Sequence, residues 1–419
     1  MAKIRIVGDA SGYVELSAQN AAGNNTLELP SGSTKLVGSD NSGNIVVGVV
    51  TATSIAGVTT AGITTAYIGA INDGPISGAR NRIINGDFRI DQRNAGVSTT
   101  PTNGAYTLDR WQAALSQTSK FTVQQSGTTA VGFTSSLLVT SSSAYTVGAS
   151  ESFRVQQNIE GFNISDLAWG TANAKPVTLS FWVRSSLTGT FGGSVLDSLT
   201  TYSYPFSYTI SSANTFEYKT ITIPGPTSGG TWGTTNGVGM LLNFSLGSGS
   251  SVSGTAGSWA SATYTSSTGA TSVVGTNGAT WYITGVQLEA GTTATAFERR
   301  SYGQELALCQ RYACVFGGSV VNQQIGQGRT SDATTIELFI PLPVTMRSQA
   351  LSSSVIGSVG NFSCNDNAVQ NAATSVTILS IGDPNVAFFN IGTTGMTASR
   401  PARVMTGTVG TKLLISAEL

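Results

Sequence analysis

WYITGVQLEAGTTATAFERRSYGQELALCQRYACVF, residues 281–316, is the stretch that decides the fold. Apolar and polar side chains alternate at its start, which predicts a β-strand at 281–288 with Gly285 at a bulge. After a break, Ser301 and Gln304 fit a capping box, in which a hydroxyl and an amide satisfy backbone N–H groups at the start of a helix. Helical spacing of apolar residues extends this helix to 317. The stretch therefore predicts a strand, a turn and one short connecting helix at 301–317.

The composition limits the classes of function. A chain of 419 residues is too long for one compact core and predicts two or three domains. Charged residues make up only 10%, with 21 basic and 21 acidic, which argues against nucleic acid and anionic membranes as partners. Histidine is absent, so the usual general base and the commonest metal ligand are missing. The 50 glycines, together with β-branched alternation, predict an all-β protein with many tight turns.

Cysteine use and the N-terminal residues indicate where the protein is made. Cys309, Cys314 and Cys364 are too sparse for a disulfide framework, and we expect three free thiols that fill apolar space. Residues 1–5 lead directly into strand-like alternation, which predicts no signal peptide. The sequence contains no run of 18 apolar residues, so we expect no membrane-spanning helix. We therefore expect synthesis in a cytoplasm and no membrane insertion.

The first two segments of the chain are a small β unit and a stalk. Residues 1–47 read as short strands joined by polar turns. In residues 48–79, Thr-rich pairs alternate with single Val or Ile residues, and one copy of such a strip cannot cover both of its faces. This favours an intertwined stalk of several identical chains over a flexible linker. The residues expected to face one another in that stalk are Val50, Ile55, Val58, Ile63 and Ile68.

The remaining segments predict two larger β domains. Residues 80–300 contain about ten short strands with Gly/Ser turns between them, which is typical of a β-sandwich. If this sandwich is a jelly roll, its first strand at 85–90 and its last at 281–288 are neighbours. Residues 318–419 form a C-terminal β domain with strands that include 336–340, 386–391 and 413–415, and we expect it to contribute to the oligomer contact.

Several motifs carry a resemblance to a known family. NGDF at 85–88, YTLDRW at 106–111, SFWV at 180–183 and ITGVQLE at 283–289 resemble the carbohydrate-binding-module-type jelly roll in tail fibres of tailed bacteriophages. FERRSY at 297–302, LPVTMR at 342–347 and SAEL at 416–419 are similar to the segment that follows this domain in the same fibres. GYVEL at 12–16 and VTATS at 50–54 resemble the N-termini and stalks of fibres from phages that infect cyanobacteria.

This resemblance implies a homotrimeric virion fibre. Residues 1–47 would attach it to other virion proteins, the jelly roll would bind glycan on the host surface, and the protein would be located on the virion. The sequence departs from the resemblance at Thr284 and Gly285, which stand where such modules often carry an aspartate that helps to hold calcium. Asp87 alone does not make a site for a hard cation. We therefore expect no bound metal.

Aromatic side chains are the candidates for glycan contact, because the apolar faces of sugar rings stack on aromatic rings. Trp111, Trp182 and Trp281 lie in strand patterns and are predicted to be core residues. Glu298 with the pair at 299–300 forms either part of a glycan site or an ion cluster between domains. The candidate glycan-binding residues, all in Gly-, Ser- and Thr-rich loops, are Trp169, Tyr202, Tyr204, Trp232 and Trp259. The alternative for these five is that each anchors its loop against the sandwich.

Two other classes of function stay open. A glycan-depolymerase tailspike needs paired carboxylates, but the candidates lie in separate segments and a serine triad would lack its histidine. A purely structural head or collar fibre, or a decoration protein, would use the same stalk without touching a receptor. The sequence favours a receptor-binding fibre that has neither enzymatic activity nor a cofactor. The candidate carboxylates for the enzyme alternative are Glu151, Glu160, Asp166 and Asp197.

Overall fold

The computed structural model describes residues 3–7, 13–17, 80–379 and 383–419. The chain divides into two compact units, residues 1–67 and 68–419. In the first unit, β1 (Lys3–Val7) and β2 (Tyr13–Ser17) pair in antiparallel fashion. The predicted stalk positions lie outside the described residues; they are Val50, Ile55, Val58, Ile63 and Ile68.

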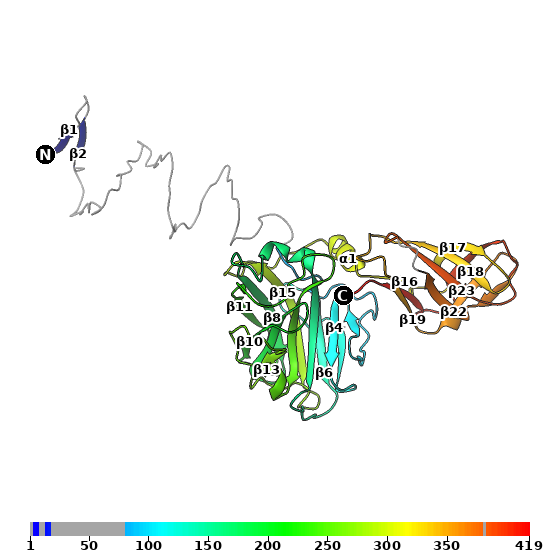
Figure 1. Ribbon diagram of the computed structural model, residues 1–419, viewed down its shortest axis with the longest axis horizontal. Helices are drawn as coiled ribbons and strands as arrows, with labels where there is room; N and C mark the ends of the chain where they lie inside the picture. The colour runs from blue at the N-terminus through cyan, green and yellow to red at the C-terminus, as the bar shows by residue number, and fades with distance from the viewer. Residues whose placement is uncertain (1–2, 8–12, 18–79, 380–382) are drawn as a thin grey trace. The chain divides into compact units, whose positions relative to one another are not determined.

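The second unit begins with a sandwich of two antiparallel sheets, which confirms the all-β prediction (Figure 1). The six-stranded sheet has the order β10 (Ser203–Ile210), β9 (Gly189–Asp197), β12 (Val238–Ser248), β7 (Ser152–Glu160), β4 (Trp111–Leu115) and β3 (Tyr106–Leu108). The five-stranded sheet has the order β11 (Glu217–Ile223), β8 (Val177–Ser185), β15 (Thr280–Ala290), β6 (Ser136–Ser141) and β5 (Phe121–Ser126). The short strands β13 (Ser253–Gly254) and β14 (Ser266–Ser267) pair in parallel, and β14 contacts β9, β10 and β12 of the six-stranded sheet.

The sandwich core lies between the two sheets, because every second side chain of each strand points inward. Trp111 and Trp281 are fully buried there, as predicted. The prediction for Trp182 is wrong. Its neighbours Phe181 and Val183 enter the core, so the alternation of β8 directs Trp182 to the outer face of the five-stranded sheet.

The N-terminal part of the sandwich runs beside β15, but it is not a strand. The N–H of Val286 donates to the carbonyl of Gly86 at 2.9 Å, so the two segments are neighbours as predicted. Residues 85–90 form a turn, because Asn85 and Phe88 both have φ of +57° and the Asn85 amide bonds Ile90. A Cβ on Gly86 would lie 2.2 Å from the carbonyl oxygen of Val286, so glycine is required at this close approach.

The bulge and the helix start in the deciding stretch are confirmed, whereas the helix end is wrong. The pairing of β15 with β8 shifts register between Thr284 and Gln287, around Gly285 at φ +61°. Helix α1 (Tyr302–Gln310) begins with the predicted capping box between Ser301 and Gln304. It does not reach 317, because residues 313–317 pair with a C-terminal strand and this tertiary pairing outweighs the helical spacing.

The C-terminal residues form two further sheets, and the strands predicted at 336–340, 386–391 and 413–415 are confirmed. The three-stranded sheet has the order β16 (Ala313–Gly317), β25 (Lys412–Ser416) and β19 (Ser352–Ile356). The seven-stranded sheet has the order β21 (Gln370–Ala372), β20 (Phe362–Asn365), β24 (Pro401–Thr406), β17 (Gln324–Thr330), β18 (Thr335–Pro341), β23 (Val386–Gly392) and β22 (Ser375–Leu379). Among the described residues, no helix has both the length and the apolar character needed to cross a membrane.

The end of the chain returns to the sandwich and forms a buried polar junction with it. The carboxylate of Glu418 forms ion pairs with Arg93, at 2.9 Å, and with Arg110. All three side chains are at most 6% exposed. Burial, with the nearby charge of Glu418, raises the pKa of Tyr106 to about 12, and its hydroxyl donates to the carbonyl of Leu419 at 2.6 Å. These contacts fix residues 418–419 against β3 and β7.

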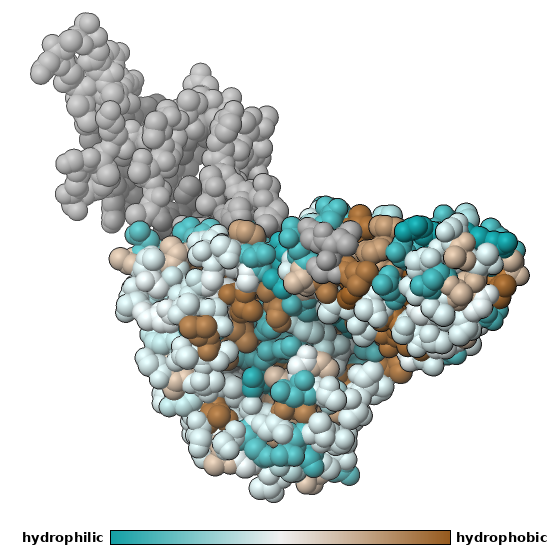
Figure 2. Space-filling model, turned by 45° about the vertical axis from the view of Figure 1, so that its right-hand side comes forward, coloured by the Kyte–Doolittle hydropathy of each residue, from teal (hydrophilic) through white to brown (hydrophobic). Residues whose placement is uncertain are grey.

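The three thiols and the surface agree with the composition. Cys309, Cys314 and Cys364 are free and buried, as predicted. Burial raises the pKa of Cys314 to about 12 and that of Cys364 to about 11. Figure 2 shows one face of the molecule, on which residues of intermediate hydropathy predominate and apolar residues form small separate patches. This is the surface expected of a chain with only 10% charged residues.

Candidate functional site

The five aromatic residues predicted for glycan contact come together in one group, which we call the loop aromatic cluster. Trp259 lies at its centre. Its ring stacks on that of Tyr202, with centroids 5.4 Å apart and an angle of 5° between the planes. It meets Trp169 and Trp232 edge to face at 5.5 and 5.6 Å. The ring of Tyr204 lies 5.1 Å away. Four separate loops therefore contribute to one aromatic group, and the fifth residue, Tyr204, was predicted in a loop but lies in strand β10.

Hydrogen bonds hold these loops in place. The indole N–H groups of Trp169, Trp232 and Trp259 each donate to a backbone carbonyl, at 2.7, 3.0 and 2.8 Å. Beneath them, the buried carboxylate of Asp197 accepts three backbone N–H groups, those of Thr201, Tyr202 and Thr231, at 2.7, 3.0 and 2.8 Å. Burial also raises the pKa of Tyr204.

This geometry can anchor loops directly, because the aromatic faces of the cluster pack against one another and its indole N–H groups are already bonded. Trp232 and Trp259 are partly buried and pack on the sandwich core. A role of the loop aromatic cluster in glycan contact stays a prediction.

A second aromatic group, which sequence reasoning missed, lies on the outer face of the five-stranded sheet. Strand pairing places Tyr218 opposite Trp182 and Tyr282 opposite Arg184, and cross-strand partners share a face. Phe216 extends this row at the edge. We call these residues the sheet platform: Trp182, Arg184, Phe216, Tyr218 and Tyr282.

The ring of Tyr218 is exposed to solvent, and the other rings of the sheet platform are partly exposed. Tyr218 is 43% exposed, and its ring centroid lies 5.3 Å from that of Trp182. The guanidinium carbon of Arg184 lies 4.9 Å from the Tyr282 ring centroid and 5.9 Å from that of Phe216. Such cation–π contacts hold a flexible side chain flat against a surface. The platform thus presents apolar ring faces and one planar cation together.

A hollow of about 210 Å³ adjoins the sheet platform. Trp182 and Tyr218 form one side, and Phe297 with Gly285 forms the other. A Cβ on Gly285 would lie 2.5 Å from the ring of Phe133, so this glycine lets the bulge of β15 pack closely there. The hydroxyl of Ser180 provides a polar group in the lining. The arrangement is an aromatic surface ending in a small depression.

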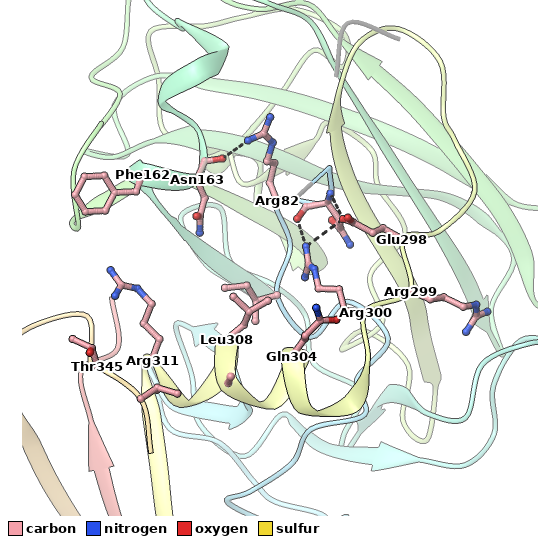
Figure 3. A pocket seen from close by; sticks show the side chains of 14 residues that line it. Arg82, Phe162, Asn163, Glu298, Arg299, Arg300, Gln304, Leu308, Arg311 and Thr345 are labelled. Carbon is pink, nitrogen blue, oxygen red and sulfur yellow. Dashed lines mark hydrogen bonds and ion pairs between the residues drawn. The ribbon is translucent and has the colours of Figure 1, made fainter. Parts of the chain in front are cut away.

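A larger hollow, of about 760 Å³, opens beside α1 and is lined by apolar, polar and charged side chains (Figure 3). Phe162 and Leu308 line it, and Phe162 is 58% exposed. Three of the arginines around this hollow form ion pairs within the folded chain. Arg82 pairs with Asp166 at 2.7 Å and Arg311 with Glu160 at 2.6 Å, while Arg300 contacts Glu298 at 3.5 Å and Glu305 at 3.3 Å. Glu298 and Arg300 therefore form an ion cluster, as one of the two predictions for residues 298–300 had it, whereas Arg299 donates to the carbonyl of Gly132 and lies over the ring of Phe133.

Each of the four carboxylates considered for an enzyme has partners of its own. Glu151 accepts from the N–H of Gly148 at 2.8 Å and from the hydroxyl of Tyr145 at 2.9 Å, and these two hydrogen bonds lower its pKa. Glu160 and Asp166 pair with arginines and Asp197 binds loop amides, as described above. Within the described ranges, no three His, Cys, Asp or Glu side chains come together in a group suited to a metal ion.

Comparison with known proteins gives only distant structural similarity. No protein-family model and no curated protein matches the sequence. Among solved structures, the enzymatically active domain of tailspike protein 4 of bacteriophage CBA120 is similar with a TM-score of 0.28 and 15% identity. The match covers 52% of this chain and 23% of that chain.

Two carbohydrate-binding modules are similar over about half of the chain. The module TmCBM61, in complex with β-1,4-galactotriose, has a TM-score of 0.25 and 12% identity, over 50% of this chain and 99% of that chain. The family 11 module from Clostridium thermocellum, in complex with a mixed-linked tetrasaccharide, has a TM-score of 0.25 and 11% identity, over 47% and 98%. At these values, the function of the present chain has to be argued from its own residues.

Proposed function

We propose that this chain is the subunit of a homotrimeric virion fibre that binds glycan on a host surface, without catalysis. The sandwich holds the glycan, the stalk at 48–79 joins three copies, and residues 1–47 attach the fibre to other virion proteins. The sequence resemblance and the weakly charged surface support the fibre, and the sheet platform supports the glycan.

The sheet platform is the observation that carries the glycan proposal. Trp182 and Tyr218 offer ring faces on a rigid β-sheet, and a sheet positions a binding surface more precisely than loops do. Sugar rings present apolar C–H faces that match such rings, while their hydroxyls need polar groups such as Ser180. In the loop aromatic cluster, by contrast, the rings pack on one another and the indole N–H groups already have partners.

Replacing Trp182 with alanine tests this assignment. We expect the W182A variant to lose about 10- to 100-fold in affinity for purified host envelope polysaccharide, because a central aromatic contact typically contributes about 1.4–3 kcal/mol. The fold should remain, since Trp182 lies outside the core, and circular dichroism checks this. The measurement is surface-immobilised polysaccharide binding by the full chain.

The matched variant is Trp232→Ala in the loop aromatic cluster, for which we expect affinity within about threefold of wild type. If W232A loses binding and W182A keeps it, the glycan site lies in the loops. Binding by neither wild type nor variants contradicts the glycan proposal and favours a purely structural fibre. Release of sugar fragments from the polysaccharide would instead indicate a depolymerase.

The trimer has a test of its own. We expect size-exclusion chromatography with light scattering to give about three times the chain mass of 43.0 kDa. A chain without residues 1–79 should then give a smaller oligomer or a monomer if the stalk holds the copies together. A monomer of the full chain at micromolar concentration contradicts the trimer.

A further inference from the structure

Arg184 is the one cation of the sheet platform, and its surroundings are apolar. Its guanidinium lies over Tyr282 and near Phe216, with the carbon 4.9 and 5.9 Å from the two ring centroids. Its Nε is buried and has no hydrogen-bond partner. A guanidinium carries five N–H donors in a planar fork that fits a carboxylate or another oxyanion. The two ring contacts therefore hold the guanidinium in position, and its N–H donors have no acceptor within the described residues.

Three other arginines of this unit differ from Arg184 in having carboxylate partners. Arg82, Arg300 and Arg311, around the hollow beside α1, each pair with at least one carboxylate at 3.5 Å or less. Over the described part of the chain, no ion pair and no hydrogen bond of the Arg184 side chain is found. The charges of those three arginines are paired with carboxylates in the folded chain, whereas the charge of Arg184 is available to a ligand.

The carboxylates nearest along the sheet already have partners. Glu217 follows Phe216, but its oxygens accept from Lys219 at 2.6 Å and from the backbone of Ser211 and Ser212 at 2.8 Å. Glu289, on the same face of β15, accepts from Thr295 at 2.7 and 2.8 Å and is buried. Neither is available to neutralise Arg184, so the platform carries a local positive charge.

We propose that the sheet platform binds an acidic glycan, in which a carboxylate or sulfate group accepts hydrogen bonds from Arg184 while a sugar ring packs on Trp182 and Tyr218. This rests on the proposed function and adds the class of glycan. An oxyanion supplies the acceptor that the guanidinium lacks, and charge-assisted bonds of this kind are about twice as strong as neutral ones. A neutral sugar would leave the charge unpaired.

The experiment uses the full chain and host envelope polysaccharides in matched forms. Each is immobilised as isolated, after chemical reduction of its uronic carboxylates to alcohols, and after desulfation. We expect at least tenfold weaker binding after one of the two treatments, and which treatment weakens it tells carboxylate from sulfate. Arg184→Gln should lose at least tenfold on the untreated polysaccharide, and Arg184→Lys should lose less because the charge remains. Binding should also weaken with added salt.

The charge control is Arg329→Gln, which removes the same charge from an arginine that is 64% exposed on the C-terminal sheet, and binding should not change. Equal binding to treated and untreated polysaccharide, with R184Q like wild type, overturns the acidic class and leaves glycan binding standing. Absence of binding to every form overturns glycan binding and the acidic class together. Loss in R329Q equal to that in R184Q shows a general charge effect and also overturns the assignment to Arg184.

Discussion

Replacing Glu418 with glutamine should lower the free energy of unfolding by about 3–5 kcal/mol, which is the cost of breaking a buried ion pair from one side. Arg110 is 1% exposed, and its carboxylate partner is Glu418. In E418Q it keeps its full charge, stacked on the ring of Tyr312 at 3.5 Å, without that partner. Arg93 is less affected because Asp109 remains 3.3 Å away.

The measurement for E418Q is denaturant unfolding followed by tryptophan fluorescence and by far-UV circular dichroism. All six tryptophans lie in the sandwich, at positions up to 281. Fluorescence therefore reports the sandwich, whereas far-UV circular dichroism reports the strands of the whole chain. We expect the C-terminal sheets to unfold at a lower denaturant concentration than the sandwich once the junction is weakened. Glu337→Gln is the control, because its pair with Arg329 is exposed and contributes less than about 1 kcal/mol. Equal stability of E418Q and E337Q would refute the role of the junction.

Asp197→Asn should destabilise the loops around the loop aromatic cluster by about 1–3 kcal/mol. Asp197 uses both carboxylate oxygens: Oδ1 accepts from Thr201 and Tyr202, and Oδ2 accepts from Thr231 at 2.8 Å. An asparagine has only one acceptor oxygen, so an N–H of its amide would face a backbone N–H. Since Asp197 is fully buried, water cannot replace the lost bond.

Near-UV circular dichroism measures this change, because Thr231 precedes Trp232 and movement of that loop alters the packed indoles. Asp332→Asn is the matched control. Asp332 is exposed, and its hydrogen bonds from the N–H and the hydroxyl of Thr334 both end on Oδ1, an oxygen that asparagine keeps. A near-UV spectrum of D197N identical to that of wild type would show that the loops do not depend on this carboxylate.

Local patterns predicted the elements whose cause is local. Alternation located β15, and the Ser301–Gln304 pair located the start of α1, because capping is decided within four residues. β9 was not predicted, since three glycines in GTFGGSVLD weaken its strand pattern. A Cβ on Gly193 would lie 2.4 Å from the ring of Phe206, so the feature that hides the strand in the sequence makes room for the core.

The candidate site was predictable in part. The sequence indicates the five aromatic residues only as separate candidates for glycan contact. The structure brings them into one cluster, which no spacing in the sequence predicts. Trp182 was assigned to the core because it lies in a strand, although its parity differs from that of Leu179, Phe181 and Val183. The alternation of buried and exposed positions along β8 therefore already indicates that Trp182 lies on the outer face. The junction at Glu418 joins residues more than 300 positions apart, and such long-range pairing has no local signal.

The three buried thiols make the protein convenient to follow by light microscopy. Because burial keeps Cys309, Cys314 and Cys364 protonated and inaccessible at neutral pH, a maleimide dye has little to react with on the native chain. A single cysteine introduced at Val131, which is fully exposed, would then carry one fluorophore per subunit. Stepwise photobleaching of such labelled molecules would count the copies in each assembly, and tracking them on living cells would record where and how long they dwell.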